Sequence, residues 1–154
     1  MTFDKFTIKA QEAVQSAVNT AQRNGQQTIE PLHLLAGVMD KGKDVVSYVF
    51  QKLGVNIQTV ESAIGNEIAH LPKVSGGGEP YFSSESNQVM QRTMDISQKF
   101  GDEFVSIEPM LLALLAVNST ASRILKDAGC SEQEMTAAIN DLRQGQKVQT
   151  QSGD

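Results

Sequence analysis

TIEPLHLLAGV at residues 28–38 returns in altered form as SIEPMLLALLA at residues 106–116. In both copies a hydroxyl residue, a glutamate and a proline come close before a strongly apolar run. A hydroxyl side chain can cap free backbone amides, glutamate suits the positive end of a helix dipole, and proline is tolerated in a first turn. Each stretch therefore predicts the start of a buried helix, and their recurrence predicts a duplicated unit.

Four other pairs of similar residues repeat at almost the same spacing as the quoted stretches, which lie 78 residues apart. In the order given below, the first three pairs are 76 residues apart and the last pair is 75 residues apart. Insertions and deletions concentrate in loops, so we expect these small length differences to fall between helices. The repeated landmarks are Phe6 and Phe82, Thr7 and Ser83, Gly25 and Gly101, and Gly54 and Gly129.

Apolar residues recur every three or four positions through most of the chain, which is the period of a helix. We predict an all-α fold of eight helices, arranged as two tandem four-helix repeats with pseudo-twofold symmetry. The first repeat covers residues 1–72 and the second covers residues 81–145. Residues 73–80 hold three consecutive glycines and predict a flexible linker, while the polar residues 146–154 predict a disordered tail.

The composition excludes several classes of protein. The 154 residues carry a net charge of −5 with scattered lysines and arginines, so nucleic-acid binding, which needs clustered positive charge, is disfavoured. Cys130 is the single cysteine and cannot form an internal disulfide. The first ten residues show no signal peptide, and no apolar run reaches the ~18 residues that span a membrane. We expect a cytoplasmic protein that contacts no membrane.

No catalytic motif is found. GVMDKGKD, at residues 37–44, resembles a phosphate-binding loop, but it ends in Asp44 instead of a hydroxyl residue and follows a helix instead of a strand. We interpret it as a turn between helices. His33 lacks nearby metal-binding partners and is expected in the core, and Cys130 is expected to be a structural thiol. The sequence predicts no enzyme, no cofactor and no metal within this chain.

Acidic and methionine residues near the repeated stretches suggest binding sites instead. Glu30 and Glu108 at helix starts stabilise the helix dipole, and they could also form two related polar sites, Thr7 with Glu30 and Ser83 with Glu108. Asp102 adds negative charge in a loop of the second repeat. Met90 and Met110 fit either the core or an adaptable binding groove.

The phrases FDKFTIKAQEAV, TIEPLHLL, LPKVSGGG and SIEPMLLALL resemble the N-terminal domain of ClpB-type AAA+ disaggregases, a double repeat of four helices. The resemblance covers the chain from about Thr2 to Gly145. It implies a mobile, non-catalytic module of a hexameric, stress-related chaperone that works with an Hsp70 system. ATP and Mg²⁺ would bind to ATPase modules absent from this chain, which would also form the hexamer. The isolated domain is expected to be a monomer.

The resemblance also implies how substrate is held. Unfolded or aggregated polypeptides would bind through an exposed apolar groove that involves Val89, Met90 and Met110. The polar positions linked to substrate handling fall on Thr7, Asp102 and Glu108. An alternative is the adaptor-docking or phosphoarginine-reading role of the protease-linked ClpA and ClpC branches. In that case, a guanidinium-bearing group would be held by Thr7, Glu30, Ser83 and Glu108.

Overall fold

The computed structural model describes residues 2–153, and over these residues eight helices and two very short strands follow one another. This confirms the predicted all-α class with eight helices. The first half contains α1 (Ile8–Arg23), β1 (Thr28–Ile29), α2 (Pro31–Lys41), α3 (Lys43–Leu53) and α4 (Ile57–Ala69). The second half contains β2 (Tyr81–Phe82), α5 (Ser84–Phe100), α6 (Ile107–Ala116), α7 (Thr120–Asp127) and α8 (Glu132–Arg143).

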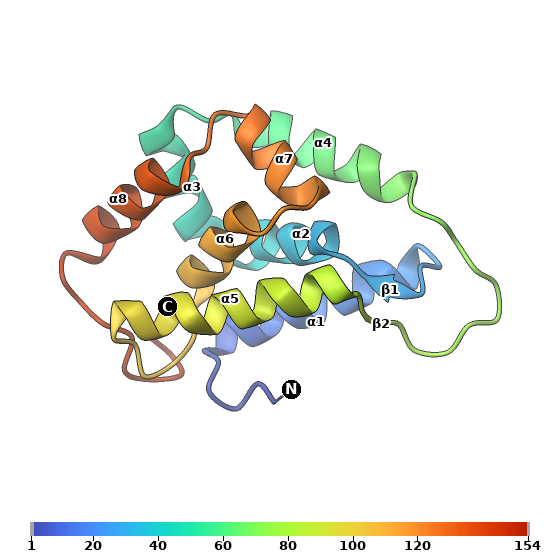
Figure 1. Cartoon of the computed structure of the whole chain (residues 1–154), viewed down its shortest axis with the longest axis horizontal. Coiled ribbons are helices and arrows are strands. Elements are labelled where there is room, and N and C mark those ends of the chain that lie inside the picture. Colours follow the sequence, from blue (N-terminus) through green and yellow to red (C-terminus); the bar gives the residue numbers. More distant parts are fainter. Residues whose placement is uncertain (1, 154) are drawn as a thin grey trace.

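The two most apolar helices, α2 and α6, lie in the middle of the molecule and contact each other (Figure 1). Helices α1 and α5 cover them on one side, and α3, α4, α7 and α8 cover them on the other. Helix α3 packs on α8, and α4 packs on α7, so contacts run between the halves at both ends. This arrangement is consistent with two repeats related by pseudo-twofold symmetry.

Helices α2 and α6 are buried because little of their surface is polar. Every residue from Ile107 to Leu115 of α6 is buried, as are all residues from Pro31 to Met39 of α2 except Ala36. A helix that is apolar on most sides must be covered by other elements on most sides, so that its apolar surface is removed from contact with water. The quoted stretches therefore supply the centre of a single core to which all eight helices contribute buried apolar residues.

Two short parallel pairings join the halves, and neither was expected from the sequence. Strand β1, just before α2, pairs with β2, just before α5. Phe6, just before α1, pairs in the same sense with Val105, just before α6. Each half therefore orders the start of a helix in the other half. Segments of two residues carry no alternation pattern from which such strands could be predicted.

The two Ile-Glu-Pro phrases do not occupy equivalent places in their helices. Glu30 is the N-cap of α2 and Pro31 its first residue, whereas Ser106 is the N-cap of α6, so Glu108 and Pro109 lie inside its first turn. The two N-caps are 76 residues apart, like the N-caps Thr7 and Ser83. The expectation that the difference between the spacings of 76 and 78 residues falls between helices was therefore wrong for this pair. Relative to the N-cap, the Ile-Glu-Pro sequence lies two residues farther along α6 than along α2. The first turn accepts proline at either position, because the N–H groups there have no intrahelical partner.

Residues 146–153 do not form the disordered tail that their polar composition predicts. We call residues 144–153 the C-terminal strap. Val148 is buried, and its carbonyl oxygen accepts hydrogen bonds from the Glu103 and Phe104 N–H groups at 2.8 and 3.3 Å. Farther on, the carbonyl of Gln151 accepts from the N–H of Ile8 at 2.8 Å. One buried valine and these backbone bonds fix a segment whose composition alone would leave it unfolded.

Two helix glycines form a matched test of packing. A methyl group on Gly37 of α2 would overlap the Ala13 carbonyl of α1, whereas one on Gly65 of α4 would meet no atom within 4 Å. Alanine is favoured over glycine in a helix interior by about 0.5–1 kcal/mol. We expect Gly65→Ala to raise the free energy of unfolding by that amount, and Gly37→Ala to lower it by about 1–3 kcal/mol because of overpacking. Urea unfolding of both variants measures this, and equal effects of the two substitutions would contradict the close α1–α2 contact.

Candidate functional site

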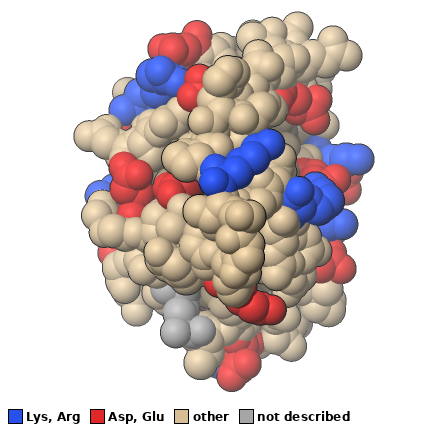
Figure 2. All heavy atoms as spheres, turned by 90° about the vertical axis from the view of Figure 1, so that its right-hand side faces the viewer, with Lys and Arg blue, Asp and Glu red and all other residues tan. Residues whose placement is uncertain are grey.

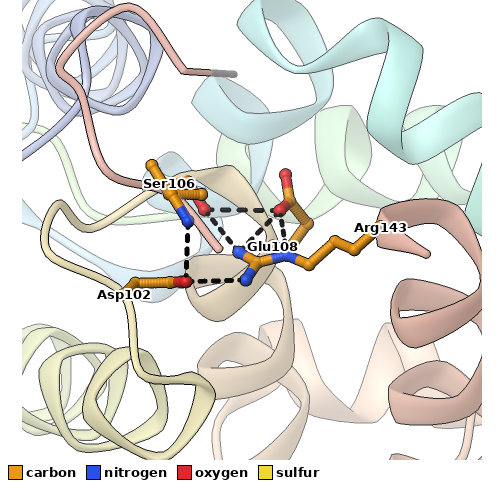
Figure 3. Close-up of polar contacts among 5 residues, drawn as sticks. Asp102, Ser106, Glu108 and Arg143 are labelled. Atoms are coloured by element: carbon orange, nitrogen blue, oxygen red, sulfur yellow. Dashed lines mark hydrogen bonds and ion pairs between the residues drawn. The ribbon is translucent and has the colours of Figure 1, made fainter. Parts of the chain in front are cut away.

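Three polar residues around the start of α6 meet Arg143, which is distant from them in sequence, at the end of α8 (Figure 3). Asp102 lies in the loop after α5, Ser106 and Glu108 lie at the start of α6, and Arg143 is the last residue of α8. The Asp102 side chain is fully buried, and the side chains of Glu108 and Arg143 are 7% and 8% exposed. We call this group the Arg143 cluster.

The guanidinium of Arg143 contacts all three of the other side chains. Its Nη1 donates to Asp102 Oδ1 at 2.8 Å, its Nε donates to Glu108 Oε1 at 2.8 Å, and its Nη2 donates to Ser106 Oγ at 3.1 Å. The guanidinium also lies over the ring of Phe100, with 4.6 Å from Cζ to the ring centroid. Arginine suits this place because its planar fork supplies several donors in fixed directions.

The Arg143 cluster contains two acidic side chains and one basic side chain. Burial alone would lower the pKa of Arg143, but the hydrogen bonds and charges of Asp102 and Glu108 outweigh burial and raise that pKa above its ordinary value. Two carboxylates face one guanidinium, so the cluster formally keeps one negative charge. Asp102 Oδ2 is buried without a hydrogen-bond partner among the described residues. The carboxyl group of Asp102 therefore depends on Arg143 for its stability in the interior.

The first half has a neutral network at the corresponding place. Gln26 and Asp102 each follow a left-handed glycine that ends the first helix of their half, and both N–H groups bond back to that helix. Glu30 N–H donates to His33 Nδ1 at 2.9 Å, which leaves the Nε2 proton to be donated to Gln26 Oε1 at 2.7 Å. Gln26 Nε2 in turn donates to the Ile68 carbonyl of α4 at 2.7 Å. In both halves this position fastens the end of the fourth helix.

His33 is thus a core residue, as predicted, and each of its two ring nitrogens makes a hydrogen bond. Cys130 is also buried. Burial, together with the nearby Glu134 carboxylate, raises the pKa of the Cys130 thiol to about 11, so it stays protonated at neutral pH. The turn predicted at residues 37–44 is shorter than expected: residues 37–41 belong to α2, Lys43 and Asp44 belong to α3, and Gly42 alone separates the two helices. Among residues 2–153, no group of His, Cys, Asp or Glu is arranged to hold a metal ion.

Backbone hydrogen bonds tie Thr7 and Ser83 each to the opposite half of the chain. Thr7, fully buried at the N-cap of α1, donates its N–H to the Val105 carbonyl beside Ser106, while Ser83 donates to the Ile29 carbonyl beside Glu30. The backbone therefore brings Thr7 toward the second copy of the phrase and Ser83 toward the first. These parallel pairings give no support to the pairing of Thr7 with Glu30 and of Ser83 with Glu108, which stays a prediction.

The apolar residues expected in a binding groove lie in the core. Val89, Met90 and Met110 are at most 1% exposed. These three side chains therefore line no open groove in the structure, and a ligand could reach them only if helices separated. The sequence could not decide between core and groove for the two methionines, because a flexible apolar side chain suits both places.

An open apolar groove lies instead along α1, beside the start of α5. It has a volume of about 430 Å³, and Ile8 at its edge is 52% exposed. The sequence signal for it was present, since Ile8 and Val18 make α1 apolar outside the buried stripe. We call this cleft the α1 groove; it is lined by Phe3, Ile8, Gln11, Glu12, Val14, Gln15, Val18 and Phe82.

Charges are spread over the surface without a single-sign patch on the face that Figure 2 shows. Basic and acidic side chains alternate there between wide uncharged areas. Such a face gives a polyanion no concentrated positive field to follow. None of the helices among residues 2–153 is long and apolar enough to cross a membrane.

Comparison with known proteins identifies relatives along the whole chain. The model of the Clp repeat (R) N-terminal domain matches residues 5–152. The chaperone protein ClpB of Bacteroides thetaiotaomicron is 57% identical over 154 residues, and that of Porphyromonas gingivalis is 46% identical over the same length. Each alignment covers 100% of this chain but 18% of the relative, so the chain spans less than a fifth of those proteins.

Solved structures share the fold at lower identity. The Hsp104 N-terminal domain from Candida albicans superposes with a TM-score of 0.87 at 22% identity, covering 98% of this chain and 99% of that one. A ClpV N-domain, solved as a complex with a VipB peptide, gives a TM-score of 0.74 at 14% identity, with 96% and 92% covered.

Removal of the arginine tests the Arg143 cluster. Arg143→Met leaves two buried carboxyl groups without their cation, and breaking a buried pair in this way costs about 3–5 kcal/mol. Arg123→Met is the matched control, because Arg123 pairs with Glu67 at 3.6 Å on the surface, with the side chains 57% and 45% exposed. We expect the control to change the free energy of unfolding by less than about 1 kcal/mol in urea titrations. Equal losses in both variants would contradict the central place of the cluster.

The buried imidazole predicts a pH dependence. Burial lowers the pKa of His33 below 6.5, against an opposing effect of the Glu30 charge. Below pH 6.5, His33 is therefore protonated in the unfolded chain at pH values where it is still neutral in the folded chain. The free energy of unfolding should fall as pH decreases from 6.5, by at most about 1.4 kcal/mol per pH unit from this group.

Urea unfolding between pH 7.5 and 5.5 measures this slope. His33→Gln should flatten it, whereas His70→Gln, a change at an exposed histidine, should leave it as in the wild type. An unchanged slope in His33→Gln would show that His33 does not contribute to the pH dependence of the free energy of unfolding.

Proposed function

Because the chain belongs to the Clp repeat N-terminal domain family and corresponds to the non-catalytic N-terminal domain of ClpB-type chaperones, we propose that it engages unfolded or aggregated polypeptides for disaggregation and refolding under stress. The α1 groove is the observation that carries this proposal. It is open, its floor is largely apolar, and its volume of about 430 Å³ suits a few side chains of an extended or helical segment.

The composition of the groove fits a weak and unselective binder. Phe3, Val14, Val18 and Phe82 offer apolar contact, while Gln11 and Gln15 add side chains that can adapt to different backbones. The ClpV N-domain, which shares this fold, has been solved with a bound peptide, so a segment of chain is a reasonable occupant here as well. We expect micromolar or weaker affinity for one domain.

Other parts of the proposal concern the longer protein. We place ATP and Mg²⁺ binding, and assembly into a hexamer, in the part that this chain lacks. Six weak grooves on flexible connections would bind one aggregate with useful avidity, because the second contact becomes intramolecular. Cooperation with an Hsp70 system in the cytoplasm belongs to the same proposal.

The phosphoarginine-reading alternative is disfavoured by the Arg143 cluster. The side chain of Glu108, one of the four residues expected to hold a guanidinium, is 7% exposed, and its Oε1 already accepts from the guanidinium of Arg143. A guanidinium from outside would have to displace this internal one. We expect phosphoarginine to leave the amide NMR signals of Glu30 and Glu108 unchanged, and shifts at these two residues would revive the alternative.

The groove is tested with a permanently unfolded, reduced and alkylated protein that carries a fluorophore. Ile8→Asp places a charge at the groove edge, and it should not harm folding, because Asp at the first helical position suits the helix dipole. Val74→Asp is the control, since Val74 is 50% exposed and lies outside the groove. In anisotropy titrations we expect Ile8→Asp to weaken binding at least about fivefold and the control to bind like the wild type. Equal binding by both variants would remove the α1 groove from the proposal.

A further inference from the structure

The C-terminal strap supports one wall of the α1 groove. Its Gln151 carbonyl accepts the N–H of Ile8 at 2.8 Å, and Ile8 lies at the groove edge. The side-chain amide of Gln151 donates to the Asp4 carbonyl at 2.9 Å, next to Phe3. Phe3 lines the groove and packs edge-on against Phe6, with 5.0 Å between the ring centroids. One strap residue thus contacts the backbone beside both Phe3 and Ile8.

The strap is in turn anchored on the Arg143 cluster. The Val148 N–H donates to Asp102 Oδ1 at 3.0 Å, and the same oxygen accepts from Arg143 at 2.8 Å. Val148 itself is buried at 7% exposure, while its neighbours Lys147 and Gln149 are exposed. The strap therefore has one apolar anchor, one bond to a buried carboxylate and otherwise polar residues.

The hydrogen bond from the Ile8 N–H to the strap matters because Ile8 is the first residue of α1. The first N–H groups of a helix have no partner within the helix. Thr7 Oγ1 accepts from Ala10 N–H at 3.2 Å, and the strap satisfies Ile8 N–H. If the strap leaves, the Ile8 N–H and the Asp4 carbonyl lose these partners. The residues that carry the edge of the groove then become more mobile.

We propose that docking of the C-terminal strap and occupation of the α1 groove are thermodynamically coupled, so that the strap regulates substrate binding. This rests on the proposed function of the groove. A docked strap holds Phe3 and Ile8 in the conformation that a segment binds, which lowers the ordering cost of binding. By reciprocity an occupied groove holds the strap more firmly. Any force or partner that lifts the strap would release substrate.

The test uses the whole chain and a matched pair of substitutions. Val148→Asp removes the apolar anchor and adds a charge beside Asp102, whereas Gln149→Asp adds the same charge at an exposed neighbour. Hydrogen exchange of the Ile8 amide reports on the strap contact, exchange of Leu114 reports on the core, and anisotropy with the unfolded protein reports on binding.

We expect Val148→Asp to speed exchange at Ile8 but not at Leu114, and to weaken binding at least about fivefold, the lower range for coupled sites. Gln149→Asp should behave as the wild type. Saturating substrate should slow exchange of the Val148 N–H in the wild type. Faster exchange at Ile8 with unchanged affinity would overturn the coupling, while absence of binding by the wild type would overturn the proposed function itself.

Gln151→Ala provides a second variant should Val148→Asp fail to fold. It keeps the Val148 anchor and the backbone bond to Ile8 but removes the side-chain bonds to the carbonyls of Asp4 and Phe6. We expect an intermediate loss of affinity from it. Wild-type affinity together with wild-type exchange at Ile8 would contradict the role assigned to Gln151.

Discussion

The central constraint of this fold is that α2 and α6 have almost no side on which water is tolerated. Nine consecutive residues of α6 are buried, and α2 is nearly as fully enclosed. Two such helices can shield each other along one face only, so the other six must cover the rest. The repeat of an apolar helix start in the sequence therefore requires that amphipathic helices pack around this central pair.

The buried polar residues hold the end of the fourth helix in both halves, but the two halves use different side chains for it. In each half the residue after the glycine at the end of the first helix fastens the end of the fourth. The first half does this with an amide and a neutral histidine, and the second with a carboxylate and an arginine. A neutral network is less costly to bury, whereas the charged one binds the strap as well as the helix. Of these two networks, the one in the second half therefore holds the strap in addition to the end of its helix.

Much of the fold follows from local signals, whereas the site depends on long-range ones. Helix limits such as Thr7 and Gly101 could be predicted, because capping and left-handed glycines are properties of a few neighbouring residues. The shift of Glu108 into its helix could not, because glutamate and proline are acceptable at several first-turn positions. The order of the strap rests on Val148, a single apolar residue whose partners lie more than forty positions away. Burial of Met90 and Met110 likewise depends on which helices cover α5 and α6.

The crossed parallel pairings have a consequence for how such a chain could arise and fold. Phe6 meets Val105, and Thr28 meets Tyr81, so neither half completes its own helix starts. A single ancestral repeat could have formed these pairings only with a second copy of itself, as a symmetric dimer. In this chain residues 73–80 join the two halves, so the pairings form within one molecule and do not depend on concentration. The same geometry makes the two halves one cooperative unit, because unfolding either half exposes the helix starts of the other.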